Sequence, residues 1–420
     1  MSARSADVAE EFAAVAAARP RCFWLDGGGA REWSGRRSIL GWLEDDDVSL
    51  TYSASRREVT RWTGGRGDVV GDDIFDALDR ELADGEGQWF GYLGYAARPD
   101  LPALPDPALP DAVWMRPSHV RMYEHDEALA RGGIAPAPAA AAAVDPGYAS
   151  AFARVQEHLH AGNTYEVNLT YRRDLDGPAR PDGPAATYLR LRALNPAPYA
   201  GFLQHDVDGG RAWLLASSPE RYATITAERM LETKPIKGTT PRGSTLDEDA
   251  AQRELLATDA KYRAENLMIV DLLRNDLAQV CEVGSVEVPS LMAVESYETV
   301  HQLVSTVRGR LRSDVTTIAA LRALFPAGSM TGAPKLRTMQ VIEEVEATPR
   351  GAYSGAFGWL AADGRADLGV IIRSLTTDGS GRYRLGTGGG ITVLSDLGEE
   401  WEESRLKAER LLRAMDAPGG

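Results

Sequence analysis

The stretch GAFGWLAADGRADLGVIIRSLTTDGSGRYRLGTGGGI, residues 355–391, contains apolar runs separated by Asp363-Gly364 and Asp378-Gly379. The runs cover residues 355–360, 368–375 and 383–391. Asp-Gly between runs of β-forming residues is a strong signal for a tight hairpin turn. We therefore expect an antiparallel meander in this part of the chain and not an array of βαβ units.

The rest of the chain divides at residues 131–146, which contain two glycines, three prolines and five consecutive alanines and offer little to anchor a core. We interpret this segment as a linker. Residues 1–130 hold short strand-like pieces and predict a β-rich part. Residues 147–420 alternate helical and strand patterns, with predicted helices at 148–160 and 261–277.

Composition restricts the class of protein. The 420 residues carry 46 basic and 61 acidic side chains, a net charge of −15, which disfavours nucleic acid and anionic membranes as partners. The two cysteines, Cys22 and Cys281, lie far apart and lack metal-ligand spacing. No run of 18 or more apolar residues occurs, and residues 1–7 lack an apolar signal core. We expect a cytoplasmic protein.

Lys237 is the strongest candidate for a nucleophile. It lies in Pro235-Ile-Lys-Gly-Thr-Thr-Pro-Arg-Gly243, a segment that we expect to be a rigid loop because proline fixes φ and glycine permits close approach. Taken alone, a lysine in such a turn is more often a solvated surface residue. From these residues alone, Lys237 is therefore either a nucleophile or a solvated surface lysine.

Two groups of carboxylates favour a metal ion. Glu265 falls on the apolar face of the helix predicted at 261–277, where an unpaired carboxylate would be costly to bury. Glu400 and Glu403 share a face of the C-terminal helix, although an ordinary helical ion pair between Glu403 and Lys407 is the simpler interpretation. Carboxylates from two helices suit Mg²⁺, which prefers oxygen ligands.

Three further features could bind an anionic ligand. Residues 328–335 lead into a helix whose N-terminus attracts anions. Residues 386–391 form a glycine run at a strand end that lets a carboxylate approach the backbone. Arg373 stands inside an apolar run, where it is either an outward-facing strand residue or a bidentate clamp for a carboxylate.

As a set, these features resemble the chorismate-utilising enzymes, and within that family the aminodeoxychorismate synthases. The resemblance covers residues 148 to 415 and rests on ordered motifs at 162–169, 218–221, 235–243, 265–268, 301, 331–335, 353–355, 386–391 and 399–407. It implies an α+β, anthranilate-synthase-like fold with two packed, mainly antiparallel β-sheets flanked by helices.

The resemblance also implies a role for each candidate residue. Glu265 and Glu403 would bind Mg²⁺ with Glu400 close by, and Glu220 would be the general acid that protonates the departing ring hydroxyl of chorismate. The implied substrate-binding residues are Tyr353, Arg373, Gly388, Gly389, Gly390, Lys407, His301, Thr331 and Glu166.

Lys237 separates the branches of the family, because anthranilate synthases usually carry alanine there and aminodeoxychorismate synthases carry lysine. The implied reaction is attack of Lys237 on carbon 2 of chorismate, followed by addition of ammonia at carbon 4, in para-aminobenzoate and folate biosynthesis or a related pathway. A nucleophilic amine must be neutral, so we expect the pKa of Lys237 to be lowered.

Glu166 departs from the family pattern, since ammonia-using members usually carry glutamine there and water-using members carry lysine. This argues against a water-using enzyme. Neither cysteine sits in the glycine-flanked elbow of a glutaminase, so we expect a separate glutamine amidotransferase subunit to supply ammonia. The alternatives are an anthranilate synthase component I, an aminodeoxyisochorismate synthase and a non-catalytic homologue.

Overall fold

The computed structural model describes residues 5–27, 37–84, 86–125, 143–177, 183–297 and 300–416. Most of the linker predicted at 131–146 lies outside these residues, and the division of the chain at that place stays a prediction. Strands from both sides of it nevertheless pair with each other: β1 (Arg21–Asp26) pairs with β10 (Tyr199–His205), and β6 (Gln88–Leu93) pairs with β18 (Ala356–Ala361).

Within the described residues the strands form two large sheets, and every strand pairing is antiparallel. The nine-stranded sheet has the order β17 (Gly332–Ala333), β9 (Glu166–Asp176), β21 (Arg382–Ile391), β20 (Ser374–Thr377), β11 (Ala212–Ser218), β10, β1, β2 (Arg37–Trp42) and β8 (His119–Glu124).

The twelve-stranded sheet begins at the edge strand that carries Lys237. Its order is β14 (Ile236–Pro241), β16 (Val300–Arg310), β13 (Met230–Lys234), β12 (Arg221–Ile225), β19 (Ala366–Val370), β18, β6, β7 (Ala112–Arg116), β3 (Val48–Ser53), β4 (Glu58–Thr63) and β5 (Arg66–Gly71), with β15 (Glu287–Ser296) also paired to β16.

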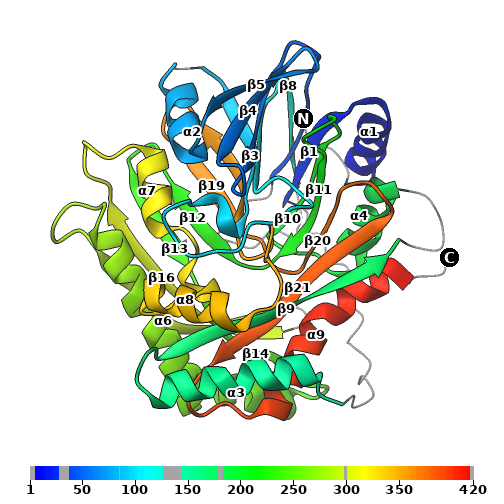
Figure 1. Ribbon diagram of the computed structural model, residues 1–420. Helices are drawn as coiled ribbons and strands as arrows, with labels where there is room; N and C mark the ends of the chain where they lie inside the picture. Colours follow the sequence, from blue (N-terminus) through cyan, green and yellow to red (C-terminus); the bar gives the residue numbers. More distant parts are fainter. Residues whose placement is uncertain are drawn as a thin grey trace.

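The two sheets pack face to face, and helices cover their outer faces (Figure 1). Between the sheets, the rings of Phe23 and Phe90 stack with centroids 4.0 Å apart. Helices α1 (Ser5–Ala18), α4 (Gly183–Leu194) and α9 (Leu397–Asp416) cover the nine-stranded sheet; α2 (Ile74–Ala83), α6 (Ala260–Ala278) and α7 (Thr317–Leu324) cover the twelve-stranded sheet. Both the α+β class and the two-sheet arrangement are therefore confirmed.

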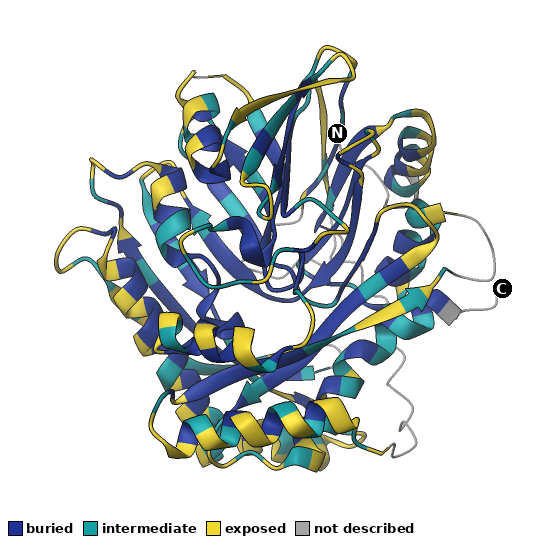
Figure 2. Ribbon diagram, in the orientation of Figure 1, coloured by how far each residue is buried: buried dark blue, intermediate teal, exposed yellow. Residues whose placement is uncertain are grey.

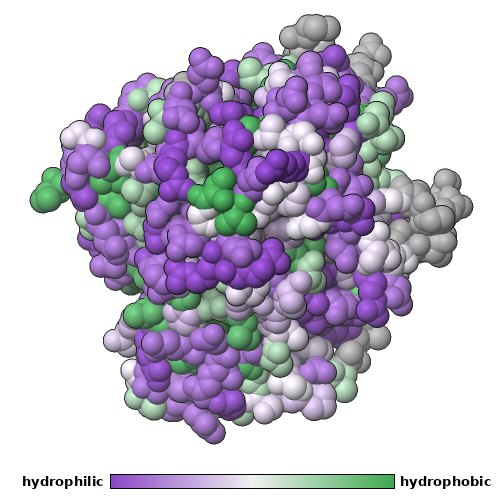
Figure 3. All heavy atoms as spheres, turned by 45° about the horizontal axis from the view of Figure 1, so that its top comes forward, coloured by the Kyte–Doolittle hydropathy of each residue, from purple (hydrophilic) through white to green (hydrophobic). Residues whose placement is uncertain are grey.

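The remaining helices lie near β9 and β14. Helices α3 (Pro146–His160) and α8 (Lys335–Val345) pack on β9 in a separate apolar cluster, and α5 (Leu246–Thr258) packs near β14. The strands are largely buried, whereas the helices expose one side (Figure 2). Hydrophilic residues predominate on the face seen in Figure 3, and no helix of the described residues is long and apolar enough to span a membrane.

The meander predicted at 355–391 is confirmed for its two turns, but the prediction of one continuous middle strand is wrong. Both Asp-Gly turns join antiparallel partners, β18 to β19 and β20 to β21. The run at 368–375, however, is interrupted: β19 belongs to the twelve-stranded sheet and β20 to the nine-stranded sheet. The interruption includes Arg373, whose φ of 49° lies in the left-handed region and cannot continue a strand. The chain thus crosses from one sheet to the other at this residue.

Candidate active site

Lys237 lies in a strand and not in the loop that the sequence suggested. Strand β14 pairs with β16, but the register shifts between Ile236 and Thr239. Gly238, with a φ of 89°, forms the irregularity, since only glycine adopts this conformation without strain. A bulge bends an edge strand and redirects its side chains. The Lys237 side chain is consequently buried, 10% exposed, and is not the solvated lysine of the alternative reading.

The partner of Lys237 is Glu166, the first residue of β9. The ammonium Nζ donates to Oε1 of Glu166, and both side chains are buried. Burial lowers the pKa of Lys237, but the carboxylates of Glu166, Glu265 and Glu220 raise it more strongly, so its pKa lies above the ordinary value. The lowered pKa that we expected for a nucleophile is therefore wrong for this state of the protein, because the site contains more acidic than basic groups near the amine.

Gly390 provides the space for this ion pair. Strand β21 runs beside β9 with Gly390 opposite Asn168. A Cβ at position 390 would lie 2.2 Å from Oε1 of Glu166 and 2.9 Å from Nζ of Lys237. Any side chain there would collide with both groups. The glycine run predicted as an anion site thus also makes room for charged side chains.

Glu220 has the environment of a general acid. It follows β11 and is 6% exposed, and burial raises its pKa to about 7, although the Ser329 hydroxyl and the charges of Lys237, Arg373 and Lys407 lower it. The carboxyl group is therefore substantially protonated near neutral pH. The structure brings this acid, the lysine and two further cationic side chains together from four separate parts of the chain.

Glu265 is a buried carboxylate that lacks a direct partner. It lies on α6, 9% exposed, and among the described residues none forms a hydrogen bond or an ion pair with it. Burial raises its pKa to about 7, with Glu166 and Glu400 contributing in the same direction. Burying an unpaired carboxylate costs free energy, and a bound cation would offset this cost. Carboxylate oxygens are the donors that Mg²⁺ prefers. The donor chemistry at Glu265 therefore fits a magnesium ion.

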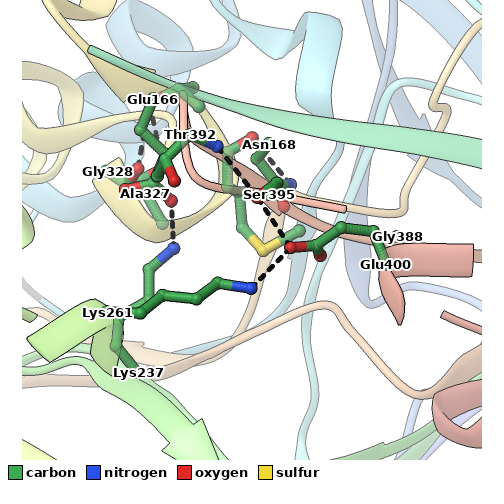
Figure 4. A network of polar contacts seen from close by, with 12 residues as sticks. Glu166, Asn168, Lys237, Lys261, Ala327, Gly328, Gly388, Thr392, Ser395 and Glu400 are labelled. Atoms are coloured by element: carbon green, nitrogen blue, oxygen red, sulfur yellow. Dashed lines mark hydrogen bonds and ion pairs between the residues drawn. The ribbon is translucent and has the colours of Figure 1, made fainter. Parts of the chain in front are cut away.

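The other two predicted ligands are paired with lysines. Oε1 of Glu400 accepts from Nζ of Lys261 at 2.9 Å and from the Ser395 hydroxyl at 2.7 Å (Figure 4). Glu403 pairs with Lys407 at 2.8 Å, which lowers the pKa of Glu403. In the part of the chain that the structure describes, no three acidic, histidine or cysteine side chains converge as a metal-binding group. The assignment of Glu400 and Glu403 to a metal stays a prediction.

Lys407 and Gly389 connect the α9 carboxylates with β21. Nζ of Lys407 donates to the Gly388 carbonyl at 3.0 Å, and a Cβ at position 389 would lie 3.1 Å from Oε2 of Glu400. Gly388 itself packs against the backbone of β9, because a Cβ at this position would lie 2.1 Å from the Leu169 carbonyl oxygen. The glycines therefore allow α9 and β9 to approach β21 from different sides.

Three predicted substrate-binding residues have other contacts in this structure. The ring nitrogens of His301 contact Asp249 at 3.0 Å and Ser296 at 2.8 Å. The Thr331 hydroxyl lies within hydrogen-bonding distance of two carbonyls in its own turn. Tyr353 is buried, with its ring beneath Gly386 and 5.4 Å from the Arg172 guanidinium. Their roles toward a substrate stay predictions.

Sequence reasoning missed Lys261 and Ser329. Lys261 precedes Glu265 by four residues, a spacing that places both side chains on one face of a helix and could have revealed it. Ser329 lies in the segment 328–335 that the sequence marked as a possible anion site, but its contact with Glu220 depends on the packing of distant segments and has no sequence signal.

A wide polar hollow of about 950 Å³ lies elsewhere, lined by residues of β3, β4 and the segments 106–110 and 206–213. None of the predicted site residues lines it. A much smaller cavity is lined by Glu220 together with Thr233, Pro235 and Ser329. The candidate site is therefore identified by the charged side chains gathered around Lys237 and not by the size of a cavity.

Comparison with known proteins gives concordant findings. The aminodeoxychorismate synthase of Streptomyces griseus is 51% identical over 64% of this chain, and that of Streptomyces pristinaespiralis is 39% identical over 97% of it. The chain spans only 36% and 64% of the length of these relatives. The crystal structure of anthranilate synthase component I from Streptococcus pneumoniae TIGR4 superimposes with a TM-score of 0.72 at 25% identity, covering 91% of this chain and 93% of that one.

The model of the chorismate binding enzyme family matches residues 21–413, a range that contains every site residue discussed above. The predicted anthranilate-synthase-like fold is thereby confirmed. The chain belongs to the family of chorismate binding enzymes.

Proposed function

We propose that this chain is component I of an aminodeoxychorismate synthase, which converts chorismate and ammonia to 4-amino-4-deoxychorismate through a covalent bond to Lys237. The observation that carries the proposal is the buried lysine in one cluster of charged residues with Glu220, a buried carboxyl group whose pKa is raised to about 7. The names of the two Streptomyces relatives support the same activity.

In the first half of the reaction, Lys237 loses one proton and its Nζ bonds to carbon 2 of the substrate. The conjugated double bonds of the ring shift toward carbon 4, the bond between carbon 4 and the hydroxyl oxygen breaks, and Glu220 gives its proton to that oxygen, which leaves as water. The proton lost by Lys237 restores Glu220, so the protons balance. A pKa of about 7 suits this donor, because a general acid works best when its pKa lies near the working pH.

In the second half, ammonia bonds to carbon 4, the ring double bonds shift back toward carbon 2, and the bond between Nζ and carbon 2 breaks. The electron pair returns to Nζ, which leaves as the free lysine. Arg373 and Lys407 are cationic groups close enough to Glu220 to lower its pKa, and they would offset the two carboxylates of the substrate. A dianion needs such local charges to approach a protein with a net charge of −15.

Magnesium would be held by Glu265 with Glu403 and Glu400, and when bound it would supply positive charge for a substrate carboxylate. In this structure Lys261 pairs with Glu400, and Lys407 pairs with Glu403.

The ammonia source would be a separate glutamine amidotransferase subunit. A glutaminase needs a cysteine thiolate, whereas burial raises the pKa of Cys22 to about 12 and that of Cys281 to about 11. Both cysteines are buried thiols and unsuited to this role. A cytoplasmic location stays a prediction.

The function is tested by incubating the purified chain with chorismate and Mg²⁺ and identifying the products by liquid chromatography. With ammonium chloride we expect 4-amino-4-deoxychorismate, and with glutamine alone we expect no product. Anthranilate or isochorismate as the product would assign another activity of the family. Turnover with glutamine alone would refute the need for a partner subunit.

The role of Glu220 predicts a distinct pH dependence. Glu220 must be protonated and Lys237 neutral, and above pH 7 the first fraction falls about tenfold per pH unit while the second rises by the same factor, so the rate of the wild type should change little with pH. Glu220→Gln should lose about 100- to 10,000-fold in rate, and its rate should rise with pH, because glutamine does not titrate and only the lysine then does. The same change at the exposed Glu228 is the control and should alter neither rate nor profile. An unchanged profile in Glu220→Gln would exclude Glu220 as the acid.

A further inference from the structure

Glu166 carries a buried oxygen atom that nothing in the structure satisfies. Its side chain is 1% exposed, and Oε1 accepts from Lys237. Oε2 is buried and has no hydrogen-bond partner among the described residues. An unpaired carboxylate oxygen away from water is costly, and native structures rarely keep one without a function. The atom therefore points to a ligand that donates hydrogen bonds.

The surroundings of Glu166 supply no hydrogen-bond donor to Oε2 among the described residues. On one side, Gly390 has no side chain, and a Cβ there would lie 2.2 Å from Oε1. On the other, β17 pairs with β9 through Gly332 and Ala333, which carry no polar side chain. Lys237 points at Glu166 from β14 (Figure 4). The carboxylate thus lies directly beside the proposed nucleophile.

The charges next to this carboxylate leave a place for a cation. Among the described residues its ion pair is with Lys237, while Glu265 from α6 is a second carboxylate close enough to interact with it. Once Lys237 is bonded to carbon 2, its nitrogen has fewer protons to donate to Glu166, so the carboxylate needs a replacement donor. The ammonium ion is a small cation with N–H donors and is also the source of the second nucleophile.

We propose that Glu166 binds the ammonium ion and accepts its proton, delivering ammonia to carbon 4. This inference rests on the proposed function. The ammonium ion gives one proton to Glu166, and the nitrogen bonds to carbon 4. The bond between Nζ and carbon 2 breaks, the electron pair returns to Nζ, and the proton on Glu166 passes to Nζ. The buried pair of Lys237 and Glu166 is thereby restored, and no other reactant is required.

The test separates the second half of the reaction from the first. Enzyme is incubated with chorismate and Mg²⁺ so that the adduct on Lys237 forms, then mixed with ammonium chloride, and loss of the adduct is followed by intact-protein mass spectrometry at several pH values. In the wild type we expect a rate that changes little between neutral and mildly alkaline pH, because the abundant ammonium ion is the species used.

Glu166→Gln keeps the shape but removes the base. We expect the adduct to form, but to react about 100-fold more slowly at neutral pH, since general base catalysis contributes at least that factor. Its rate should rise about tenfold per pH unit, following the fraction of free ammonia. Glu166→Asp retains a carboxylate and should retain the flat profile. Binding of chorismate, measured by calorimetry, checks that each variant is folded.

Three results would overturn the inference. Equal rates and equal pH profiles in the wild type and Glu166→Gln would show that Glu166 does not handle ammonium. Failure of a folded Glu166→Gln to form the adduct would assign Glu166 to the activation of Lys237 instead. Absence of both adduct and aminated product in the wild type would refute the proposed function itself and this inference with it.

Discussion

Lys237→Ala is expected to abolish the adduct with chorismate and to lower the formation of 4-amino-4-deoxychorismate by at least about a thousandfold, since removal of a covalent nucleophile is among the most damaging changes in an active site. Intact-protein mass spectrometry detects the adduct, and chromatography detects the product. Lys234→Ala is the matched control, because Lys234 is also a buried lysine, three residues earlier, paired with Glu295 at 2.8 Å. It should keep both adduct and product.

Loss of Lys237 also leaves Glu166 buried without its partner, which can destabilise the fold by several kcal/mol. The double variant Lys237→Met with Glu166→Gln removes both charges and retains the volume, so it separates folding from chemistry. If it binds chorismate but forms no adduct, the lysine acts as the nucleophile. Aminated product at the wild-type rate from either variant would reduce Lys237 to a binding residue.

Arg350→Leu is expected to destabilise the protein by about 3–5 kcal/mol, the range measured when one partner of a buried ion pair is removed. Arg350 is 3% exposed, and its guanidinium bonds Glu346 at 2.8 and 3.0 Å. The same group donates to the carbonyls of Met330 at 2.6 Å and Asn168 at 2.8 Å. Arg350 therefore holds β9 beside the turn that leads to Thr331. Its loss removes one of the two positive charges that offset the buried Glu346 carboxylate.

Urea denaturation of the wild type and variant measures this effect. Arg365→Leu is the control, because it removes an exposed arginine whose pair with Asp363 at 2.7 Å should contribute no more than about 1 kcal/mol. Arg350 and Arg172 hold the pKa of Glu346 below its ordinary value. This stabilisation is present above the pKa of the unfolded chain and is lost as the pH falls through the folded pKa, so the difference between wild type and Arg350→Leu should shrink in acid. Equal stability of the two arginine variants at neutral pH would contradict the prediction.

The sequence predicted local structure well wherever a short-range signal exists. Asp-Gly turns, helical periodicity and alternation of apolar residues placed the hairpins at 363 and 378 and the helices near 148 and 261. It could not show that the run at 368–375 changes sheets at Arg373, because the left-handed backbone there follows from the packing of two sheets and not from the residue type. The bulge that turns Lys237 inward was hidden for the same reason.

For the site, the sequence by itself indicated which residues are candidates for the chemistry: a lysine between prolines and glycines, carboxylates on two helices, a glycine run, and a glutamate at position 166. Only the tertiary structure decided how they interact. It pairs Lys237 with Glu166, 71 residues away, and so raises a pKa that we expected to be lowered. It also places lysines on two of the carboxylates assigned to magnesium. Protonation and ion pairing depend on distance and burial, which arise only when remote segments pack together.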